Sequence, residues 1–396
     1  MPPTLTDLKA TQQHTKAHND SLVLSTIYGA LKISRAAVAR RTGLSRTSVG
    51  EAVGELLERG LVEEVGRGQT SGGKPPILLR VKSDARHVIG VDLSGEEFRG
   101  AVYNLRGEAR HVLSVRREGR SGAAALELAY VLLERLVNAA GAPVLGLGIG
   151  TPGLIDFRRG SQVHWAVNLD WLEIPLRARL EERYGVPVHV LNDSQAAAMG
   201  EYFFGASGGS GNLVVIKCEE GLGAGIVLEG QLLYGDHFGA GEIGHLVFTE
   251  GGRRCRCGNT GCLETVASGS AILRAANGRA MDMRSIGEAY AGGDVDVREL
   301  VHAAARGLGL AIATLVGTLN VQDIVIAGSV AQLGEPFLTA VRHEVRTRSL
   351  AVLARDTHVK FSSIASDITS LGAAAVLLHQ ELGIWPLRRQ THSWPA

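Results

Sequence analysis

Three cysteines and one histidine in the middle of the chain have the spacing of a metal site. Cys255 and Cys257 are one residue apart, Cys262 follows five positions later, and His245 lies ten positions before the first cysteine. Glycines inside the loop allow the tight backbone turns that wrap an ion. Three thiolates and an imidazole complete a closed tetrahedral shell, which is typical of structural zinc because no position remains for a catalytic water. The spacing therefore predicts a structural Zn²⁺ site, in preference to a disulfide or unrelated buried cysteines.

Two carboxylates accompany these ligands without being needed to bind zinc. Glu242 precedes His245 by three residues, and Glu264 follows Cys262 by two. If zinc fixes the loop, both acids and the second ring nitrogen of His245 can face one cleft. Carboxylates and imidazole exchange hydrogen bonds with neighbouring hydroxyls, so this set suits a polyhydroxylated ligand.

The two elements E-I-G-H (242–245) and C-R-C-G-N-T-G-C-L-E (255–264) resemble the signature of the ROK family, which contains sugar kinases and sugar-responsive transcriptional repressors. This resemblance implies that Glu242, His245 and Glu264 contact a sugar, and that His245 also binds zinc. The motif is long, so we give the resemblance more weight than any single residue.

Further hydroxyl contacts are implied by the same resemblance at Asn168, Asn192 and Asp193. In the kinases of the family, the residue at the position of Asp193 is the general base that takes a proton from the sugar. Without the other motifs, Asn192 and Asp193 would equally suit a helix cap before Ser194. If the chain has no kinase activity, Asp193 is a vestigial base that keeps only its ligand contact.

The loops that hold ATP phosphates in the family's kinases differ here. The first loop, 92–97, reads D-L-S-G-E-E where kinases have D-x-G-G-T, so Ser94 and Glu96 depart from the pattern. The second loop, 219–223, reads E-E-G-L-G where kinases have G-T-G-x-G. Carboxylates at contact distance repel a triphosphate. We therefore expect that the protein is not an enzyme.

The elements that must position these residues are predicted to form an α/β body. Strands and helices alternate in two similar halves, and the resemblance implies the two-lobed actin-like (ribonuclease-H-like) architecture with the ligand between the lobes. We place the small lobe at 86–192 and the large lobe, with the zinc loop, at 193–370. A closing helix over 371–385 is expected to return to the small lobe.

Residues 1–82 read as a winged helix-turn-helix domain. We expect the first twenty residues to be loosely ordered and a first helix over 20–29. Ser34 then caps a short helix, 42–44 form a turn, and Ser45 caps a second helix, which would enter the major groove of DNA. A hairpin with a glycine-rich wing follows, and wing residues of this kind reach phosphates or the minor groove. An ordinary three-helix domain is the alternative. The residues placed to contact DNA are Ser45, Arg46, Thr47, Ser48, Arg67 and Lys74.

Charge is unevenly distributed over the 396 residues. Residues 1–82 contain 12 Lys and Arg against 7 Asp and Glu, whereas the remainder contains 29 against 33. A basic head on a mildly acidic body is typical of a DNA-binding module joined to a sensor. The N-terminus lacks the apolar core of a signal peptide, and the longest apolar run, near 307–319, reads as a buried helix. We expect a cytoplasmic protein without a membrane partner.

These features predict a sugar-responsive DNA-binding transcriptional repressor, and the chain resembles the family's repressor branch, which includes the xylose and N-acetylglucosamine repressors. The resemblance further implies a homodimer or tetramer, a palindromic operator and a sugar effector bound between the lobes. The alternative is a sugar kinase that carries a DNA-binding head. A zinc-dependent hydrolase is a third reading, which the closed zinc shell disfavours.

Overall fold

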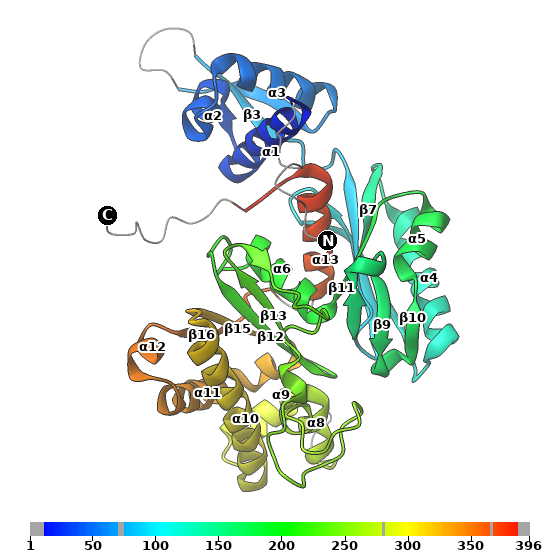
Figure 1. Cartoon of the computed structure of the whole chain (residues 1–396), viewed down its shortest axis with the longest axis vertical. Coiled ribbons are helices and arrows are strands. Elements are labelled where there is room, and N and C mark those ends of the chain that lie inside the picture. Colours follow the sequence, from blue (N-terminus) through cyan, green and yellow to red (C-terminus); the bar gives the residue numbers. More distant parts are fainter. Residues whose placement is uncertain (1–11, 70–74, 279–281, 365–366, 387–396) are drawn as a thin grey trace.

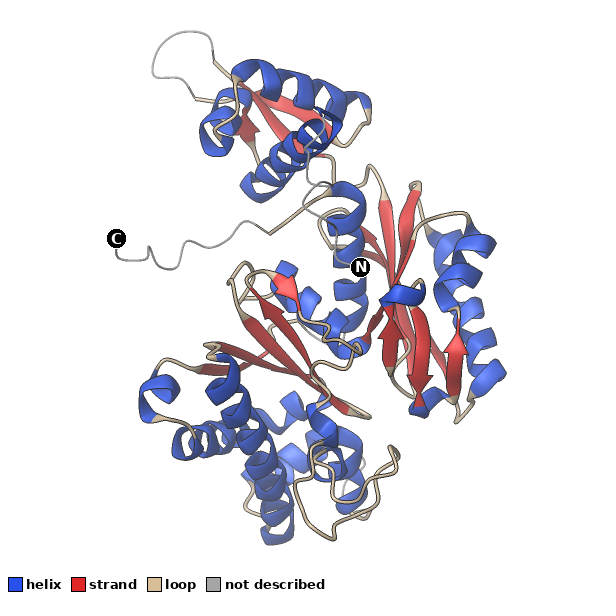
Figure 2. Cartoon of the chain, viewed as in Figure 1, coloured by secondary structure: helices blue, strands red, loops and turns tan. Residues whose placement is uncertain are grey.

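The computed structural model describes residues 12–69, 75–278, 282–364 and 367–386. A small N-terminal head sits on a two-lobed body (Figure 1). The body contains two five-stranded sheets with helices on both faces (Figure 2). The mixed α/β architecture and the winged helix-turn-helix head are confirmed.

The head is built from three helices and a three-stranded sheet in the order β1-β3-β2. Ser34 and Ser45 cap α2 and α3 as expected, and each hydroxyl accepts a hydrogen bond from a backbone N–H of the first turn. Gly43, between the two helices, has φ +73°, a conformation that costs glycine little. The elements of the head are α1 (Gln12–Ala30), β1 (Ile33–Ser34), α2 (Arg35–Thr42), α3 (Arg46–Glu58), β2 (Val62–Arg67) and β3 (Ile77–Val81).

The expectation for the first twenty residues was partly wrong. Helix α1 already includes Gln12, whereas the sequence predicted a helix only from Asp20. Lys16 in this extension forms an ion pair with Glu55 of α3. Exposed polar residues give no hydrophobic periodicity, so the start of α1 left no signal in the sequence.

The two sheets of the body have the same topology. In each sheet, three consecutive strands are antiparallel to one another. The next two strands lie beside the first of these three and run parallel to it. The strand orders are β6-β5-β4-β7-β11 and β14-β13-β12-β15-β16. The first lobe contains β4 (His87–Asp92), β5 (Glu97–Asn104), β6 (Ala109–Arg116), α4 (Gly122–Ala139), β7 (Val144–Thr151), β8 (Leu154–Asp156), β9 (Gln162–Ala166), β10 (Trp171–Ile174), α5 (Leu176–Tyr184) and β11 (Val188–Asn192), with 3-10 helices η2 (Phe157–Arg159) and η3 (Val167–Leu169).

The second lobe follows directly after β11. It contains α6 (Asp193–Phe204), β12 (Leu213–Cys218), β13 (Leu222–Leu228), β14 (Gln231–Leu232), α7 (Glu264–Ala267), α8 (Gly269–Ala275), α9 (Met283–Ala291), α10 (Val295–Leu319), β15 (Asp323–Ala327), α11 (Gly334–Arg348), α12 (Ala351–Arg355) and β16 (His358–Phe361), with 3-10 helices η4 (Ile243–His245) and η5 (Ser329–Leu333). The last helix is α13 (Ile368–Leu382), which starts three residues earlier and ends three residues earlier than the sequence predicted.

Helix α13 lies against strands β4 and β7 of the first lobe and against α6. The backbones approach so closely that a Cβ atom on Gly372 would lie 1.7 Å from the carbonyl oxygen of Ala196 in α6. A Cβ on Gly90 in β4 would lie 1.9 Å from the carbonyl oxygen of Ser370. Only glycine permits such contacts, so these positions lock α13 to both neighbours.

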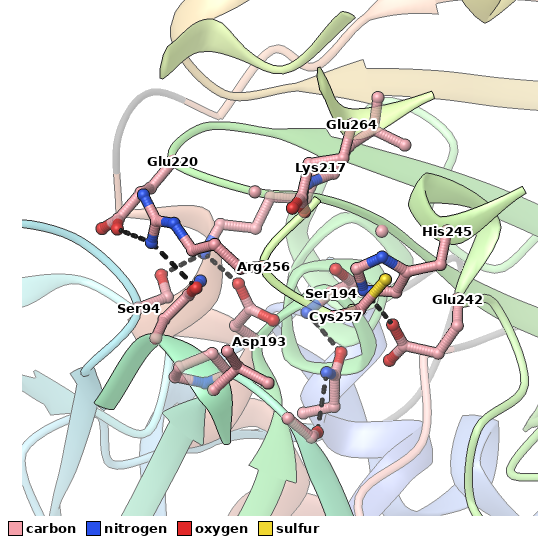
Figure 3. A pocket seen from close by; sticks show the side chains of 18 of the residues that line it. Ser94, Asp193, Ser194, Lys217, Glu220, Glu242, His245, Arg256, Cys257 and Glu264 are labelled. Carbon is pink, nitrogen blue, oxygen red and sulfur yellow. Dashed lines mark hydrogen bonds and ion pairs between the residues drawn. The ribbon is translucent and has the colours of Figure 1, made fainter. Parts of the chain in front are cut away.

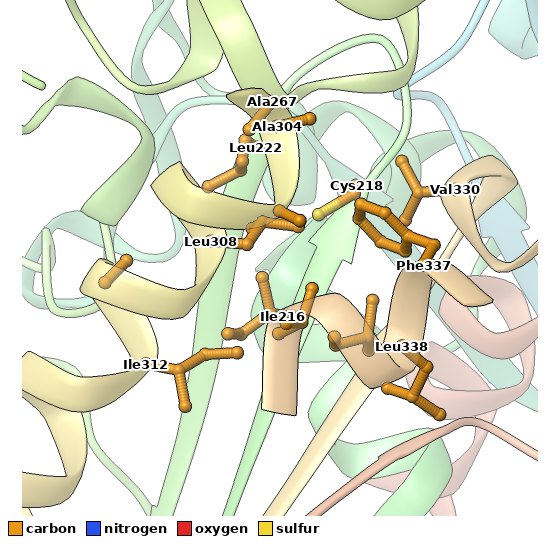
Figure 4. Close-up of a cluster of buried hydrophobic side chains, with 14 of the residues drawn as sticks. Ile216, Cys218, Leu222, Ala267, Ala304, Leu308, Ile312, Val330, Phe337 and Leu338 are labelled. Atoms are coloured by element: carbon orange, nitrogen blue, oxygen red, sulfur yellow. The ribbon is translucent and has the colours of Figure 1, made fainter. Parts of the chain in front are cut away.

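The largest core belongs to the second lobe, where α10 and α11 cover one face of the sheet. Ile216 and Cys218 of β12 pack with Leu308 of α10 and Phe337 of α11 (Figure 4). Helix α10 is long and apolar enough to cross a membrane, but 61% of its most apolar window is buried inside the protein. The apolar run predicted to be a buried helix is therefore a core helix.

Head and body share one hydrophobic core. Ile27 of α1 belongs to the same buried cluster as Leu378 of α13 and Ile384, which follows it. The hydroxyl of Ser21 donates a hydrogen bond of 2.6 Å to the carbonyl oxygen of Gly383, and Trp385 N donates to Ser25 Oγ at 3.1 Å. The first helix of the head thus contacts the segment that ends the body.

Candidate functional site

A pocket of about 930 Å³, including the part open to solvent, lies between the two lobes. Figure 3 shows Glu242 and His245 on one side of it and Glu220 with Arg256 on the other. All six residues predicted to contact a sugar line this pocket: Asn168, Asn192, Asp193, Glu242, His245 and Glu264. The structure thus brings together side chains that are separated by almost a hundred positions in the chain.

The four predicted metal ligands form one cluster, with ligand atoms all within 4.8 Å of one another. Cys255 Sγ lies 3.7 Å from His245 Nδ1, and Cys257 Sγ lies 3.7 Å from Cys262 Sγ. A tetrahedron of ligands about 2.3 Å from its centre has edges of roughly 3.8 Å. The geometry therefore fits a tetrahedral metal ion, and this Cys/His cluster could bind one.

Glu242 and His245 face the pocket together. His245 directs Nδ1 to the cysteines, and its Nε2 lies 3.7 Å from Glu242 Oε2. Burial, together with the negative charges of Asp193 and Glu264, raises the pKa of Glu242 to about 7. Glu264 is fixed from another side, because Leu222 N donates a hydrogen bond of 3.1 Å to its Oε2.

Asn192 acts as the N-cap of α6. Its Oδ1 accepts hydrogen bonds from Ser194 N at 2.8 Å and Gln195 N at 3.3 Å, while its Nδ2 donates to Gly153 O at 3.0 Å. The side chain therefore serves the capping function that the sequence offered as an alternative. It also places the next residue, Asp193, at the start of α6 and at the wall of the pocket.

Lys217 of β12 is a residue that the sequence analysis did not select. Its Nζ donates hydrogen bonds to Asp193 Oδ2 at 2.9 Å, Asp92 Oδ2 at 3.2 Å and Ser94 Oγ at 2.6 Å. Burial alone would lower its pKa, but the charges of the two aspartates outweigh burial and raise it. A buried ammonium thus joins the first strand of each lobe. The feature of the sequence that could have indicated this buried group is a single lysine inside an otherwise apolar strand.

Glu96 and Glu220, one in each loop that corresponds to a phosphate loop of the kinases, are paired with arginines. The guanidinium of Arg117 forms ion pairs with Glu96 and with Glu220, the latter at 3.4 Å. Arg256, which lies between two of the cysteines, is 2.7 Å from Glu220 Oε1 and donates to Asn168 Oδ1 at 2.9 Å. Arginine partners were not predicted, and they join the first lobe to the second at the rim of the pocket.

A second cavity of about 1790 Å³ adjoins the pocket and shares Ser94, Lys217, Glu219 and Glu220 with it. Residues of both loops that correspond to the kinases' phosphate loops line it, together with residues that follow β15 and β16. Burial raises the pKa of Glu219, with the charge of Lys217 acting in the opposite direction. Glu219 and Glu220 thus stand where the two cavities meet, whereas Glu96 lines only the second cavity.

On the head, Arg46 and Thr47 are exposed at the start of α3. Ser45 and Ser48 are used for capping, since Ser48 N donates to Ser45 Oγ at 3.0 Å and the two hydroxyls lie 2.9 Å apart. Arg67 is exposed at the end of β2, next to the wing. Lys74 lies outside the described residues, so its predicted contact stays a prediction.

Each of the two parts of the chain matches a known protein family. Residues 88–381 match the ROK family, and residues 18–69 match the MarR family. The xylose repressor of Caldicellulosiruptor bescii is 30% identical over 387 residues, covering 93% of this chain and 97% of the repressor. A crystal structure of a ROK family transcriptional regulator, a homologue of the E. coli MLC protein, superposes with a TM-score of 0.80 at 28% identity, covering 94% and 98% of the chains.

Kinases are also relatives of the body. The ROK family glucokinase of Streptomyces griseus, solved with glucose and AMPPNP, has a TM-score of 0.65 at 28% identity and covers 73% of this chain and 98% of its own. Fold and pocket together thus define a protein with a winged-helix head on a body of the sugar-kinase type. The chain belongs to the ROK family.

Proposed function

We propose that this protein is a sugar-responsive DNA-binding transcriptional repressor. The observation that carries the proposal is the combination, in one chain, of a winged-helix head with an interlobe pocket lined by carboxylates, an imidazole and amides. The relative and the solved regulator that share this arrangement over nearly their whole length are named a xylose repressor and a transcriptional regulator. The proposal includes the domain boundaries. The head ends at residue 82 and the body begins at residue 86, and the first lobe ends at residue 192 and the second begins at residue 193.

In this proposal the sugar is bound by Asn168, Asp193, Glu242, His245 and Glu264, with Asn192 positioning the helix that carries Asp193. A structural Zn²⁺ bound by His245, Cys255, Cys257 and Cys262 holds the loop that presents these acids. The tetrahedral spacing of the ligand atoms supports zinc, because thiolate and imidazole donors suit this ion. The pocket then needs no catalytic step, and Asp193 contributes as a hydrogen-bonding group.

DNA would be read by the N-terminal turn of α3, where Arg46 and Thr47 are free of packing, and the backbone would be contacted by Ser45, Ser48, Arg67 and Lys74. Two copies of the head on a palindromic operator require a homodimer or tetramer. We place the protein in the cytoplasm, where its thiolates stay reduced and its DNA is accessible.

Kinase activity is the competing function, supported by the fold shared with the glucokinase. The ion-paired glutamates Glu96 and Glu220 argue against it, since Glu96 lines the second cavity and Glu220 lines both cavities, so that carboxylates face the space next to the sugar pocket. A triphosphate would have to displace both ion pairs and approach both carboxylates.

The proposal is tested with the purified zinc-loaded protein. A thermal-shift screen against common sugars, with and without Mg-ATP, should give a shift with one sugar and no further shift with ATP. Sugar-dependent consumption of ATP would instead establish a kinase. In parallel, DNA selected from a random library should contain an inverted repeat, and Arg46→Ala should lower its affinity by at least tenfold. Arg284→Ala, which removes an exposed arginine from the large lobe, is the control.

A further inference from the structure

An apolar strip leads out of the sugar pocket across the small sheet β8-β9-β10. Trp165 of β9 is directly opposite Leu154 of β8 and Leu172 of β10. Residues opposite one another in neighbouring antiparallel strands project on the same face, so the three side chains form a row. Leu154 and Trp165 line the pocket, whereas Leu172 does not.

Exposure along this strip rises with distance from the pocket. Leu154 is half-buried, Trp165 is 44% exposed and Leu172 is 66% exposed. Val167, 37% exposed, also lines the pocket next to Asn168. The strands lie about 4.8 Å apart, so the strip spans roughly 10 Å from the pocket wall outward. An exposed apolar strip continuous with a ligand pocket marks a surface for ligand binding.

Trp165 differs from the other tryptophan of this small sheet. Trp171 is 2% exposed, and its indole Nε1 donates a hydrogen bond of 2.9 Å to the carbonyl oxygen of Gly122. The indole N–H of Trp165 makes no hydrogen bond within the part of the chain that the structure describes, and its ring is partly exposed to solvent. A tryptophan with an uncovered ring and a free N–H is suited to stack on a ring that carries hydroxyls.

We infer that the pocket takes a disaccharide, with one sugar ring among the carboxylates and the second stacked on Trp165 and continuing toward Leu172. This inference rests on the proposed sugar-sensing function and specifies its ligand class. The inner polar side chains already bind the hydroxyls of one ring. The C–H face of a pyranose is apolar, so a second ring linked to the first covers the strip that a monosaccharide leaves in water.

The test compares matched sugars on the full-length zinc-loaded protein by isothermal titration. Xylose is compared with xylobiose, glucose with cellobiose and maltose, and N-acetylglucosamine with diacetylchitobiose. We expect one disaccharide to bind at least tenfold more tightly than its own monosaccharide. Trp165→Ala should remove most of this difference, Trp165→Phe should keep most of it, and Leu172→Ala should reduce it about threefold.

Leu350→Ala is the matched control, because Leu350 is 68% exposed on the large lobe and lies outside the pocket. Binding of the disaccharide should also shift the tryptophan fluorescence to shorter wavelength in the wild type and not in Trp165→Phe. A monosaccharide that binds as tightly as its disaccharides, or a Trp165→Ala variant that weakens both equally, would overturn the disaccharide inference while the repressor proposal stands. Failure of every sugar to bind would overturn both.

Discussion

The guanidinium of Arg117, in the first lobe, lies 3.4 Å from the carboxylate of Glu220, in the second. The Arg117 side chain is only 6% exposed, and the same group is paired with Glu96. The pair therefore connects the two lobes across the interlobe cleft.

Removal of this arginine should destabilise the protein. Arg117→Ala leaves Glu220, which is largely buried, with Arg256 as its remaining partner. Breaking a buried ion pair from one side costs on the order of 3 kcal/mol. Urea denaturation measures the loss. Arg99→Ala, which breaks an exposed pair with Glu97, is the control and should cost less than about 1 kcal/mol. Equal losses for the two variants would show that the interlobe pair adds no stability.

Loss of one proposed zinc ligand should weaken sugar binding, although Cys257, which lines the pocket, is not one of the proposed sugar contacts. In Cys257→Ser the zinc content should fall from one equivalent toward zero, and sugar affinity should fall by at least tenfold because Glu242 and His245 are no longer held. Elemental analysis and titration measure the two quantities. Cys218→Ala removes the buried cysteine that is not a ligand and should retain the metal. Full sugar affinity in the metal-free variant would contradict the positioning function.

The exposed face of α3 contains glycines that a folded head does not need. A Cβ at Gly50 or Gly54 would meet nothing within 4 Å. Gly50→Ala should therefore stabilise the protein by about 1 kcal/mol, since glycine is a poor helix former. If α3 lies in the major groove, the added methyl should lower operator affinity.

Gly317→Ala provides the matched control, because Gly317 is exposed in α10 with equally open surroundings. It should give the same gain in melting temperature and leave operator affinity at the wild-type value. If Gly50→Ala binds operator as tightly as this control, α3 does not approach DNA along this face.

The contact between head and body should transmit the sugar response. Gly383 has φ +64°, and a Cβ there would lie 2.2 Å from Ser21 Oγ. Gly383→Ala should separate α1 from the end of α13, so that sugar still binds but changes operator affinity much less than in the wild type. Gly185→Ala imposes the same backbone strain at φ +67° without a neighbouring atom, and serves as control. Gel shifts with and without sugar measure the coupling. An unchanged sugar response in the first variant would exclude this contact from the transmission path.

The same junction should be sensitive to acid. Burial, followed by the charge of His189, lowers the pKa of His379, whose ring packs on Trp385 at 3.7 Å between centroids. Because the unfolded state binds more protons than the folded state below about pH 6.5, this histidine reduces stability as pH falls through that value. His379→Gln should flatten the dependence of stability on pH between 7.5 and 5, measured by urea denaturation. His343→Gln, at an exposed site on α11, should leave it unchanged. A wild-type slope in His379→Gln would assign the acid sensitivity to other groups.

Much of the fold could be predicted from the sequence because its signals are local. Serine caps, glycine turns and apolar periodicity located α2, α3 and the strands of the two five-stranded sheets, but not the small sheet β8-β9-β10. The ligand cluster was predicted from the spacing of Cys255, Cys257 and Cys262. The ion pair of Arg117 with Glu220 and the contacts of Lys217 with Asp92 and Ser94 could not be predicted in this way, because they join residues that are more than a hundred positions apart. The start of α1 was missed since its first turns bury no apolar side chain.

Among the described residues, the head contacts the body at several places that are far apart in the sequence. Leu105 N donates to Ser83 O at 2.9 Å, the Arg106 guanidinium donates to the carbonyl oxygen of Tyr28 in α1, and Ser21 donates to the carbonyl oxygen of Gly383. A domain fixed at one point can swivel in any direction, whereas a domain fixed at several separated points must move with the surface that carries them. Any change in the pocket that displaces α13 is therefore expected to carry α1, and α3 with it, in one direction. Such a change cannot scatter the head over many orientations.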